Sequence, residues 1–274
     1  MNGIVKLIQG SEEWHTHRAL YRNASEAAAM LGLSPWMSQY QLWEIKTGRR
    51  RQETTYPMQR GLELEPKARA AYEEFTGNIM QAVVMLNGDY SASLDGMSLS
   101  GDLILEVKCP MKGKESETWK QAVAGKVERH YELQVQQQLM VSGASMCHFW
   151  VYDGKVRAMV EVLPNPQDWE LLKTGWDAFM KFVVTDTPPP LTALDTVYRE
   201  DDDWREAAEA YIANKEAAEE AAKAAEEAKS QLVALAQHSS ERGYGVAVCK
   251  FWRGRMNSKQ EVRVTVTKGE KLPC

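Results

Sequence analysis

Several features that would quickly classify a chain of 274 residues are missing. The only four cysteines, Cys109, Cys147, Cys249 and Cys274, are scattered and form no CxxC pair. We therefore expect reduced thiols, and neither a disulfide framework nor a structural zinc site. There is also no apolar run long enough to cross a bilayer and no secretion signal. These absences predict a soluble protein of the cytoplasm with no membrane partner.

An excess of positive charge is also missing. Lysine and arginine together number 33 against 38 aspartates and glutamates, which gives a formal net charge of -5 at pH 7. This balance excludes a uniformly basic nucleic-acid binder, so any contact with DNA must come from a local basic surface. Hydrophobic residues make up 44% of the chain, which is enough to build a core and argues against disorder of the whole chain.

The most informative stretch of the sequence is residues 91–110. Asp95 precedes a glycine in a predicted turn, and after an apolar run Glu106 and Lys108 flank Val107. Side chains alternate between the two faces of a strand, so Glu106 and Lys108 are expected on one side and Val107 in the core. A hairpin would bring Asp95 beside them. Such oxygen ligands suit Mg²⁺ or Mn²⁺. An exposed strand with ordinary solvated charges would show the same pattern.

Two helical segments are predicted within residues 10–48. Ser11 is expected to cap the first segment, which carries Trp14 and Arg18. Ser25 is expected at or near the start of the second, where free backbone N–H groups and the helix dipole favour an anion. Arg18 could close the same pocket. The alternative is that Ser25 only caps a helix and that Arg18 is a surface charge.

Two later helices supply further candidates. The segment 58–75 has apolar residues on one helical face, and Glu65 lies close to that face. A buried carboxylate must be paired or bound to metal, which makes Glu65 the candidate for a third acid. The segment 127–141 carries Gln134 and Gln138, one turn apart. A glutamine here could bond Lys108 or a DNA phosphate, or could simply lie on the helix surface.

The order of the predicted elements indicates an α/β fold. Helices come first, then the acid-bearing hairpin, one more helix, two strands and a last helix over residues 169–183. This order predicts a small mixed sheet flanked by helices, in a core domain of residues 1–190 that ends at a run of three prolines.

The C-terminal part has a different composition. Residues 200–229 contain eleven acids and four bases, many alanines and no glycine or proline, which predicts a helix within residues 200–240. Residues 241–274 contain eight bases and three acids and are predicted to form a small basic β segment. This appendage could touch DNA, a neighbouring subunit or a partner protein.

Together these pieces resemble the PD-(D/E)XK nuclease superfamily and, within it, the lambda exonuclease/YqaJ-type viral recombinases. The matching motifs follow the family order over residues 12–185 and are Trp14-His15 with Arg18 and Ala24-Ser25-Glu26, Gly61 with Glu65 and Ala68-Arg69, Leu94-Asp95-Gly96, Glu106-Val107-Lys108-Cys109-Pro110, and Gln134-Val135-Gln136. Leu94 stands where the family usually has proline. Asp102 is a spare acid, but the Asp-Gly turn and its spacing favour Asp95.

The resemblance implies a restriction-endonuclease-like core and a set of roles. Asp95, Glu106 and the backbone carbonyl of Val107, assisted by Glu65, would hold Mg²⁺, with two ions per site expected and Mn²⁺ able to substitute. Lys108 would position or deprotonate the attacking water.

Other roles follow from the same resemblance. Gln134 would hold Lys108 or the substrate backbone. Arg18 and Ser25 would form the 5′-phosphate pocket, and Trp14 and Gln136 would add DNA contacts.

The resemblance also implies an activity. Such an enzyme digests one strand of linear double-stranded DNA from the 5′ end and leaves a 3′ overhang for a single-strand annealing protein. Family members are phage or prophage proteins that form a homotrimer ring, which the composition of this chain does not show. Two alternatives stay open: a sequence-specific endonuclease on the same core, and a DNA-end-binding module without catalysis. The second would be expected to lack an acid or the lysine, and all are present.

Overall fold

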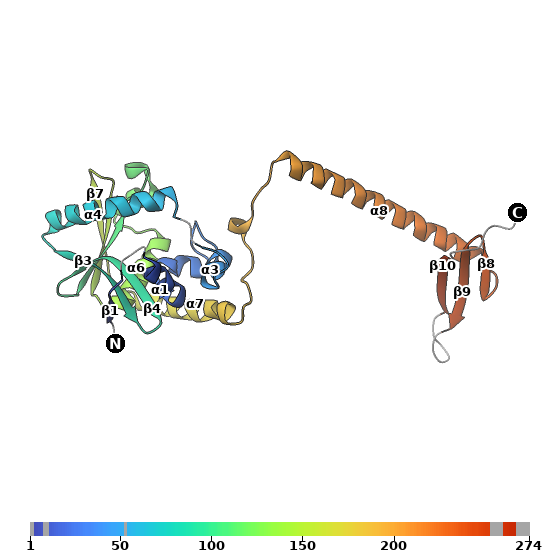
Figure 1. The fold of residues 1–274 in the computed structure, drawn as a ribbon, viewed down its shortest axis with the longest axis horizontal. Coiled ribbons are helices and arrows are strands. Elements are labelled where there is room, and N and C mark those ends of the chain that lie inside the picture. The colour runs from blue at the N-terminus through green and yellow to red at the C-terminus, as the bar shows by residue number, and fades with distance from the viewer. Residues whose placement is uncertain (1–2, 8–10, 52–53, 253–259, 267–274) are drawn as a thin grey trace. The chain divides into compact units, whose positions relative to one another are not determined.

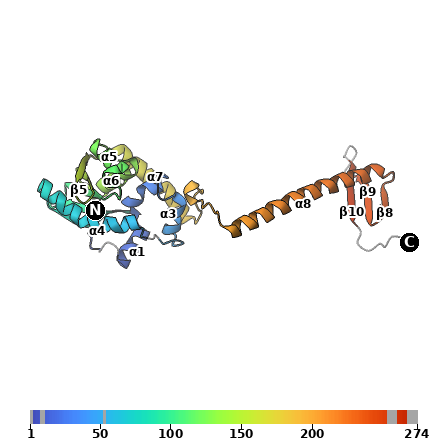
Figure 2. The same cartoon turned by 90° about the horizontal axis from the view of Figure 1, so that it is seen from above.

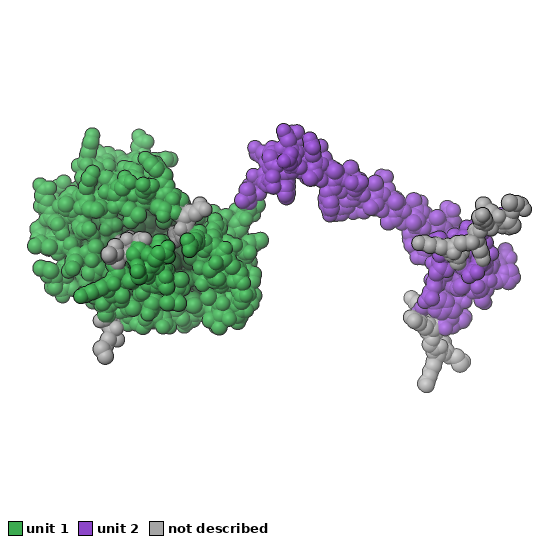
Figure 3. Space-filling view, in the orientation of Figure 1, with its two compact units in different colours: residues 1–196 green, residues 197–274 purple. Residues whose placement is uncertain are grey.

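The computed structural model describes residues 3–7, 11–51, 54–252 and 260–266. It divides into two compact units, residues 1–196 and residues 197–274, which Figure 3 colours separately. Among the described residues, no helix is both long enough and apolar enough to span a membrane.

The first unit is built on a mixed seven-stranded sheet (Figure 1). The strands, in spatial order, are β1 (Gly3–Val5), β3 (Met80–Asn87), β4 (Tyr90–Ser98), β5 (Leu103–Lys108), β6 (Met146–Tyr152) and β7 (Arg157–Val162), and β2 (Arg22–Asn23) pairs with β4 off this path. Strands β5 and β6 are parallel, as are β2 and β4, and the other pairs are antiparallel. The central strand β5 is therefore covered on both edges.

Helices cover both faces of this sheet (Figures 1 and 2). They are α1 (Glu12–Leu20), α2 (Ala27–Met30), α3 (Gln39–Lys46), α4 (Tyr56–Thr76), α5 (Glu117–Val123), α6 (Arg129–Ser142) and α7 (Pro166–Val184), with short 3₁₀ turns at Ala24–Glu26, Gly113–Glu115 and Ala193–Asp195. Helix α4 packs Tyr72 against Trp150 on one face. Helix α6 packs Val135 and Leu139 on the other face, and α7 lies behind it. The predicted α/β core with a small mixed sheet between helices is confirmed.

Local details agree with the sequence in some places and differ in others. Ser11 caps α1 as predicted, since its Oγ accepts from the backbone N–H of Trp14 at 3.1 Å. Ser25 caps no helix and lies inside the 3₁₀ turn that precedes α2. Asp95 lies within β4 and not in a turn. The glycine that follows it, Gly96, permits a close approach of strands, because a Cβ there would lie 2.8 Å from that of Met80.

The second unit consists of one long helix and a small sheet. Helix α8 (Asp202–Leu235) is capped at its N-terminus by Asp201, whose Oδ1 accepts from the backbone N–H of Trp204 at 3.0 Å. None of the residues of α8 is buried. Strands β8 (Ser240–Gly243), β9 (Val246–Trp252) and β10 (Gln260–Val266) form an antiparallel sheet with β9 in the middle. The rest of the predicted basic segment, 253–259 and 267–274, lies outside the described residues.

Candidate active site

Acidic side chains gather where β4 and β5 part. The β4–β5 ladder ends at the pair Gly96 and Leu105. Just beyond it, Oδ2 of Asp95 accepts a hydrogen bond from the backbone N–H of Val107 at 2.7 Å. A side chain thus replaces the strand-to-strand bond, and a carboxylate is fixed at the end of β5, beside Glu106.

Glu106 and Lys108 point to the same side of β5, as the strand period predicted. Lys108 Nζ lies 2.6 Å from Glu106 Oε1, and Glu106 is only 2% exposed. Two glutamines of helix α6 form hydrogen bonds with this pair. Gln134 donates to Glu106 Oε1 at 2.8 Å and its Oε1 accepts from Lys108 at 3.3 Å. Gln138 donates to Glu106 Oε2 at 2.6 Å. Both oxygens of this carboxylate are therefore occupied.

Two further groups complete the acid cluster, which we define as Asp95, Glu106, Lys108, Glu65 and Arg69. Helix α4 supplies Glu65, the predicted third acid, with its side chain largely buried. Arg69 lies one turn further along α4, with its Nη1 3.4 Å from Glu65 Oε1. The same guanidinium donates to the backbone carbonyl of Asp95. Arg69 therefore ties α4 to β4 at the site.

The acid cluster holds more negative charge than it can neutralise. Burial raises the pKa of Asp95 well above its usual value, and repulsion from Glu106 and Glu65 raises it further. Burial also raises the pKa of Glu65, although Arg69 partly offsets the effect. Burial is the larger cause of both shifts, and the shortage of cations follows from the three carboxyl groups that share only Lys108 and Arg69.

Lys108 is held in its charged form. Burial lowers the pKa of Lys108, but the attraction of Glu106, Tyr131 and Asp95 outweighs it, so the net shift is upward. The Tyr131 ring lies below the ammonium group, with its centroid 4.5 Å from Nζ. Lys108 is therefore a fixed cation at neutral pH and is suited to position groups by donating hydrogen bonds.

The donor set fits a hard divalent cation. It offers carboxylate oxygens without sulfur or imidazole, and three acids face two cationic side chains. In the described part of the chain, no three His, Cys, Asp or Glu side chains are close enough to hold a metal ion as they stand. In this arrangement both oxygens of Glu106 are bonded, to Lys108 and Gln134 on one side and to Gln138 on the other. Binding a cation there requires Glu106 to exchange one of these contacts.

A second cluster lies between α1 and the turn before α2. Arg18 donates to Ser25 Oγ at 3.0 Å and forms an ion pair with Glu26 at 3.2 Å. Its guanidinium stacks over the Trp14 ring, 4.6 Å from the centroid. Lys46 from α3 meets the other oxygen of Glu26 at 2.7 Å. The structure thus brings together three predicted residues, Trp14, Arg18 and Ser25. We call this group, with Glu26 and Lys46, the basic cluster.

Strand β4 connects the two clusters. The indole N–H of Trp14 donates to Ser93 Oγ at 3.3 Å, and Ser93 stands two positions before Asp95 on the same strand. His17 of α1 also contacts this strand, with its Nε2 3.0 Å from Ser91 Oγ. Helix α1 is therefore anchored directly beside the acid cluster.

Two predicted or candidate residues do not join the site. The Gln136 side chain is 2% exposed, its amide donates to the carbonyl of Leu163 at 2.8 Å and its Oε1 accepts from the backbone N–H of Asn165 at 2.8 Å. It holds the loop after β7, so the prediction of a DNA contact is corrected to a structural role. Asp102 bonds Ser98 Oγ at 2.9 Å in the turn after β4 and is exposed. It does not compete with Asp95.

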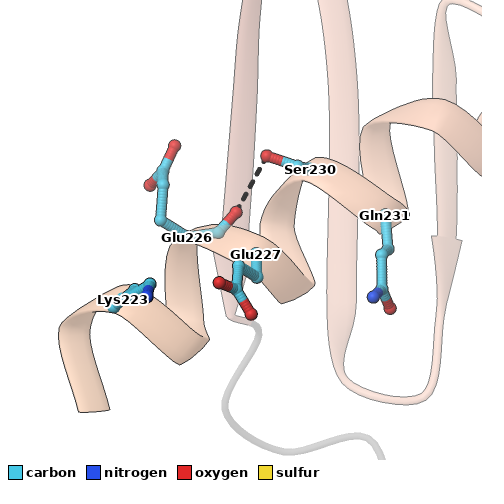
Figure 4. A pocket seen from close by; sticks show the side chains of 5 residues that line it. All are labelled: Lys223, Glu226, Glu227, Ser230 and Gln231. Carbon is cyan, nitrogen blue, oxygen red and sulfur yellow. Dashed lines mark hydrogen bonds between the residues drawn. The ribbon is translucent and has the colours of Figure 1, made fainter. Parts of the chain in front are cut away.

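The sequence indicated Gln138, one turn after Gln134, as a second glutamine that could bond the lysine, and the structure places its amide on Glu106. Lys46 gave no signal in the sequence, since it lies 20 residues from Glu26. On α8, a shallow hollow is lined by Lys223, Glu226, Glu227, Ser230 and Gln231 (Figure 4). Its side chains are exposed and Ser230 bonds only the Glu226 carbonyl, at 2.9 Å. This hollow offers no comparable chemistry.

The fold and the position of the acids define the class: the first unit is a restriction-endonuclease-like α/β core. Residues 13–145 match the model of the YqaJ-like viral recombinase domain. This part of the chain is thus similar to a YqaJ-type domain, and the resemblance drawn from the motifs is confirmed.

Solved structures give the same relationship. The alkaline exonuclease LHK-Exo of Laribacter hongkongensis is 27% identical, with a TM-score of 0.56 over 65% of this chain and 94% of that one. The structure of LHK-Exo in complex with dAMP is 25% identical, with a TM-score of 0.55 and the same coverage. No curated protein matches the chain.

Proposed function

We propose that the protein is a metal-dependent exonuclease that digests one strand of linear double-stranded DNA from its 5′ end and leaves a 3′ overhang. The observation that carries this proposal is the acid cluster, in which Asp95, Glu106 and Lys108 meet at the ends of two neighbouring strands of a YqaJ-type domain. The family match supports a nuclease role, and a solved neighbour is described as an alkaline exonuclease.

Mg²⁺ is the proposed cofactor, with Mn²⁺ as a substitute and two ions per site. Asp95, Glu106, Glu65 and the carbonyl of Val107 would hold the ions. Bound there, such ions polarise a scissile phosphate and lower the pKa of an attacking water. The raised pKa values of Asp95 and Glu65 support the proposal, because a bound cation would relieve the repulsion among the carboxyl groups that adds to the effect of burial.

The protein's own groups would orient the reaction. Lys108 is charged and donates hydrogen bonds, so it would fix the attacking water and stabilise charge that develops on the phosphate oxygens. Gln134 would keep Lys108 in place, since its Oε1 is 3.3 Å from Nζ. Gln138 would fix the Glu106 carboxylate from the other side.

The basic cluster would supply the 5′ polarity. It has Glu26 as its single acid and two cations, Arg18 and Lys46, and therefore carries excess positive charge. A terminal phosphate carries more negative charge than an internal one, which suits the Arg18 guanidinium and the Ser25 hydroxyl. Since β4 joins the basic cluster to the acid cluster, a 5′ end bound there would lie beside the acids.

The wider setting of the proposal rests on the family match. We propose that the 3′ overhang serves a single-strand annealing protein in phage-type recombination, in the cytoplasm of a bacterial host. A homotrimer ring around the DNA would keep the enzyme on its substrate between cleavage steps.

Digestion of labelled DNA tests the proposal. Linear duplexes with a 5′-phosphate or a 5′-hydroxyl, and covalently closed circles, are incubated with the full chain and Mg²⁺. Asp95→Asn and Lys108→Met are run alongside, and Asp102→Asn is the matched control because it removes a nearby exposed acid. We expect loss of the phosphorylated strand, intact circles, two inactive variants and an active control.

Other results would change the assignment. Cuts in closed circles would indicate an endonuclease on the same core. Binding of ends without metal-dependent cleavage would indicate an end-binding module and contradict the proposal.

A further inference from the structure

One tryptophan next to the acid cluster is left open to solvent. Trp36, in the loop between α2 and α3, is 65% exposed. Its ring stands at 89° to that of His130, with centroids 4.7 Å apart, and 5.7 Å from the ring of Tyr131. Tyr131 is the residue whose ring lies under the Lys108 ammonium group. The exposed indole therefore lies one aromatic ring away from the catalytic lysine.

The loop holds this indole in a fixed position. Ser34 Oγ accepts hydrogen bonds from the backbone N–H groups of Trp36 and Met37, both at 3.2 Å. Pro35, between Ser34 and Trp36, restricts the backbone of the loop. Met37 packs against the buried core between helices α2, α3, α6 and α7, and Ser38 caps α3. Both sides of the loop are thus anchored, which holds the indole at the surface of the protein.

We infer that Trp36 is a stacking platform for one base of the DNA strand held at the acid cluster, braced by His130. The inference rests on the proposed function and adds a residue that reads the end of the substrate. A nucleobase stacks on an aromatic side chain whatever its sequence, which suits an enzyme that digests DNA without sequence preference. The indole and the Lys108 ammonium group both lie against the Tyr131 ring, at 5.7 and 4.5 Å from its centroid, and a base of the strand held there would cover the exposed indole.

Fluorescence tests this contact. 2-Aminopurine, whose emission is quenched by stacking, is placed at each of the first three positions from the 5′ end of a linear duplex. All proteins are full-length and carry Asp95→Asn, so that the DNA is not cleaved. We expect quenching at one position and its loss with Trp36→Ala, together with roughly 5- to 100-fold weaker binding. Trp36→Phe should retain most of the quenching.

A matched variant and an abasic substrate separate stacking from a structural role. Leu33→Ala, in the same exposed loop, should behave like the parent protein. Removing the base at the quenched position should weaken binding by the parent and should cost Trp36→Ala nothing further. Equal losses in both proteins, or failure of Trp36→Phe to restore quenching, would overturn the inference and leave Trp36 as a cover for Tyr131.

The two proposals fail separately. If the wild-type chain does not cleave linear DNA, the proposed function fails. If it cleaves, and Trp36→Ala binds and quenches like Leu33→Ala, only the stacking inference fails.

Discussion

Two buried ion pairs in the first unit consist of the same two residue types, but the charged groups around each pair differ. Glu106 with Lys108 and Glu26 with Lys46 are both glutamate–lysine pairs, at 2.6 and 2.7 Å. Each glutamate also accepts from an amide side chain, Gln138 in the first case and Asn23 in the second. The pairs themselves would not distinguish a functional site from a structural one.

The surroundings of the two pairs do distinguish them. Glu106 has two acids near it, and its lysine keeps 20% of its side chain exposed. The Lys46 side chain is 2% exposed and also donates to the carbonyls of Arg18 and Tyr21, at 2.7 and 2.6 Å. Lys46 has all its donors satisfied inside the protein, whereas the acid cluster has unbalanced charge.

This difference indicates what each cluster can bind. An excess of carboxylates attracts a metal ion, and an excess of cations attracts a phosphate, so adjacent sites of opposite sign can share one nucleic-acid end. Lys108 is expected to serve the chemistry, and Lys46 is expected to hold the fold around Arg18. The predictions below test this assignment, from the largest expected effect to the smallest.

Lys108→Met should lower the cleavage rate by about 100- to 1000-fold, since it removes a preorganised donor at the reacting phosphate. The substitution also leaves Glu106 buried beside two other acids without its cation, so the melting temperature should fall, and circular dichroism checks that the variant is folded at the assay temperature. Single-turnover cleavage of a labelled linear duplex gives the rate. A variant that is folded and fully active would remove Lys108 from the site.

Lys46→Met should destabilise the protein by about 3–5 kcal/mol, because it leaves the Glu26 carboxylate buried without its full set of partners. Chemical denaturation followed by circular dichroism measures this loss. Lys173→Met is the matched control, since Lys173 pairs with Glu170 on the surface of α7 and should contribute about 1 kcal/mol or less. Equal effects of both variants would show that the basic cluster has no special structural role.

Arg18→Lys should reduce the preference for a 5′-phosphate over a 5′-hydroxyl by roughly tenfold. Lysine keeps the charge but cannot reach Ser25 and Glu26 at once, as the guanidinium does. The ratio of kcat/KM for the two ends gives the preference. Arg49→Lys, at an exposed ion pair with Asp186, should leave it unchanged; an unaltered ratio in Arg18→Lys would place the phosphate elsewhere.

The metal-free protein should lose stability as the pH rises above the ordinary carboxyl range. The folded state binds protons at Asp95 and Glu65 more tightly than the unfolded chain does, because both pKa values are raised. The stabilisation is therefore present at low pH and lost as the pH rises through the raised values. Melting temperatures in EDTA across the acidic to neutral range measure the effect, and Asp95→Asn should flatten the curve.

The sequence predicted those parts of the site that depend on local periodicity. The two-residue period of a strand placed Glu106 and Lys108 on one side, and the face of a helix indicated Glu65. The assignment of Gln136 failed because α6 is buried almost all round. Its consecutive glutamines Gln136, Gln137 and Gln138 each bond a different part of the fold, and an apolar stripe does not reveal this.

Contacts that depend on tertiary packing could not be predicted from the sequence. Lys46 meets Glu26 only because α3 folds back against the turn before α2. In the sequence Trp36 is an ordinary loop residue. Its place beside the site depends on the Tyr131 ring, which contacts both Trp36 and Lys108.

The most direct test of the account is the effect of Mg²⁺ on the melting temperature of wild type and Asp95→Asn at neutral pH, with Asp102→Asn as the control. We expect Mg²⁺ to raise the free energy of unfolding of wild type and of the control by about 3 kcal/mol when its concentration is one hundred times the dissociation constant. Asp95→Asn should melt higher than wild type without metal and gain little from it. Equal stabilisation of all three proteins, or of none, would contradict the claim that surplus acid at β4 and β5 forms the metal site.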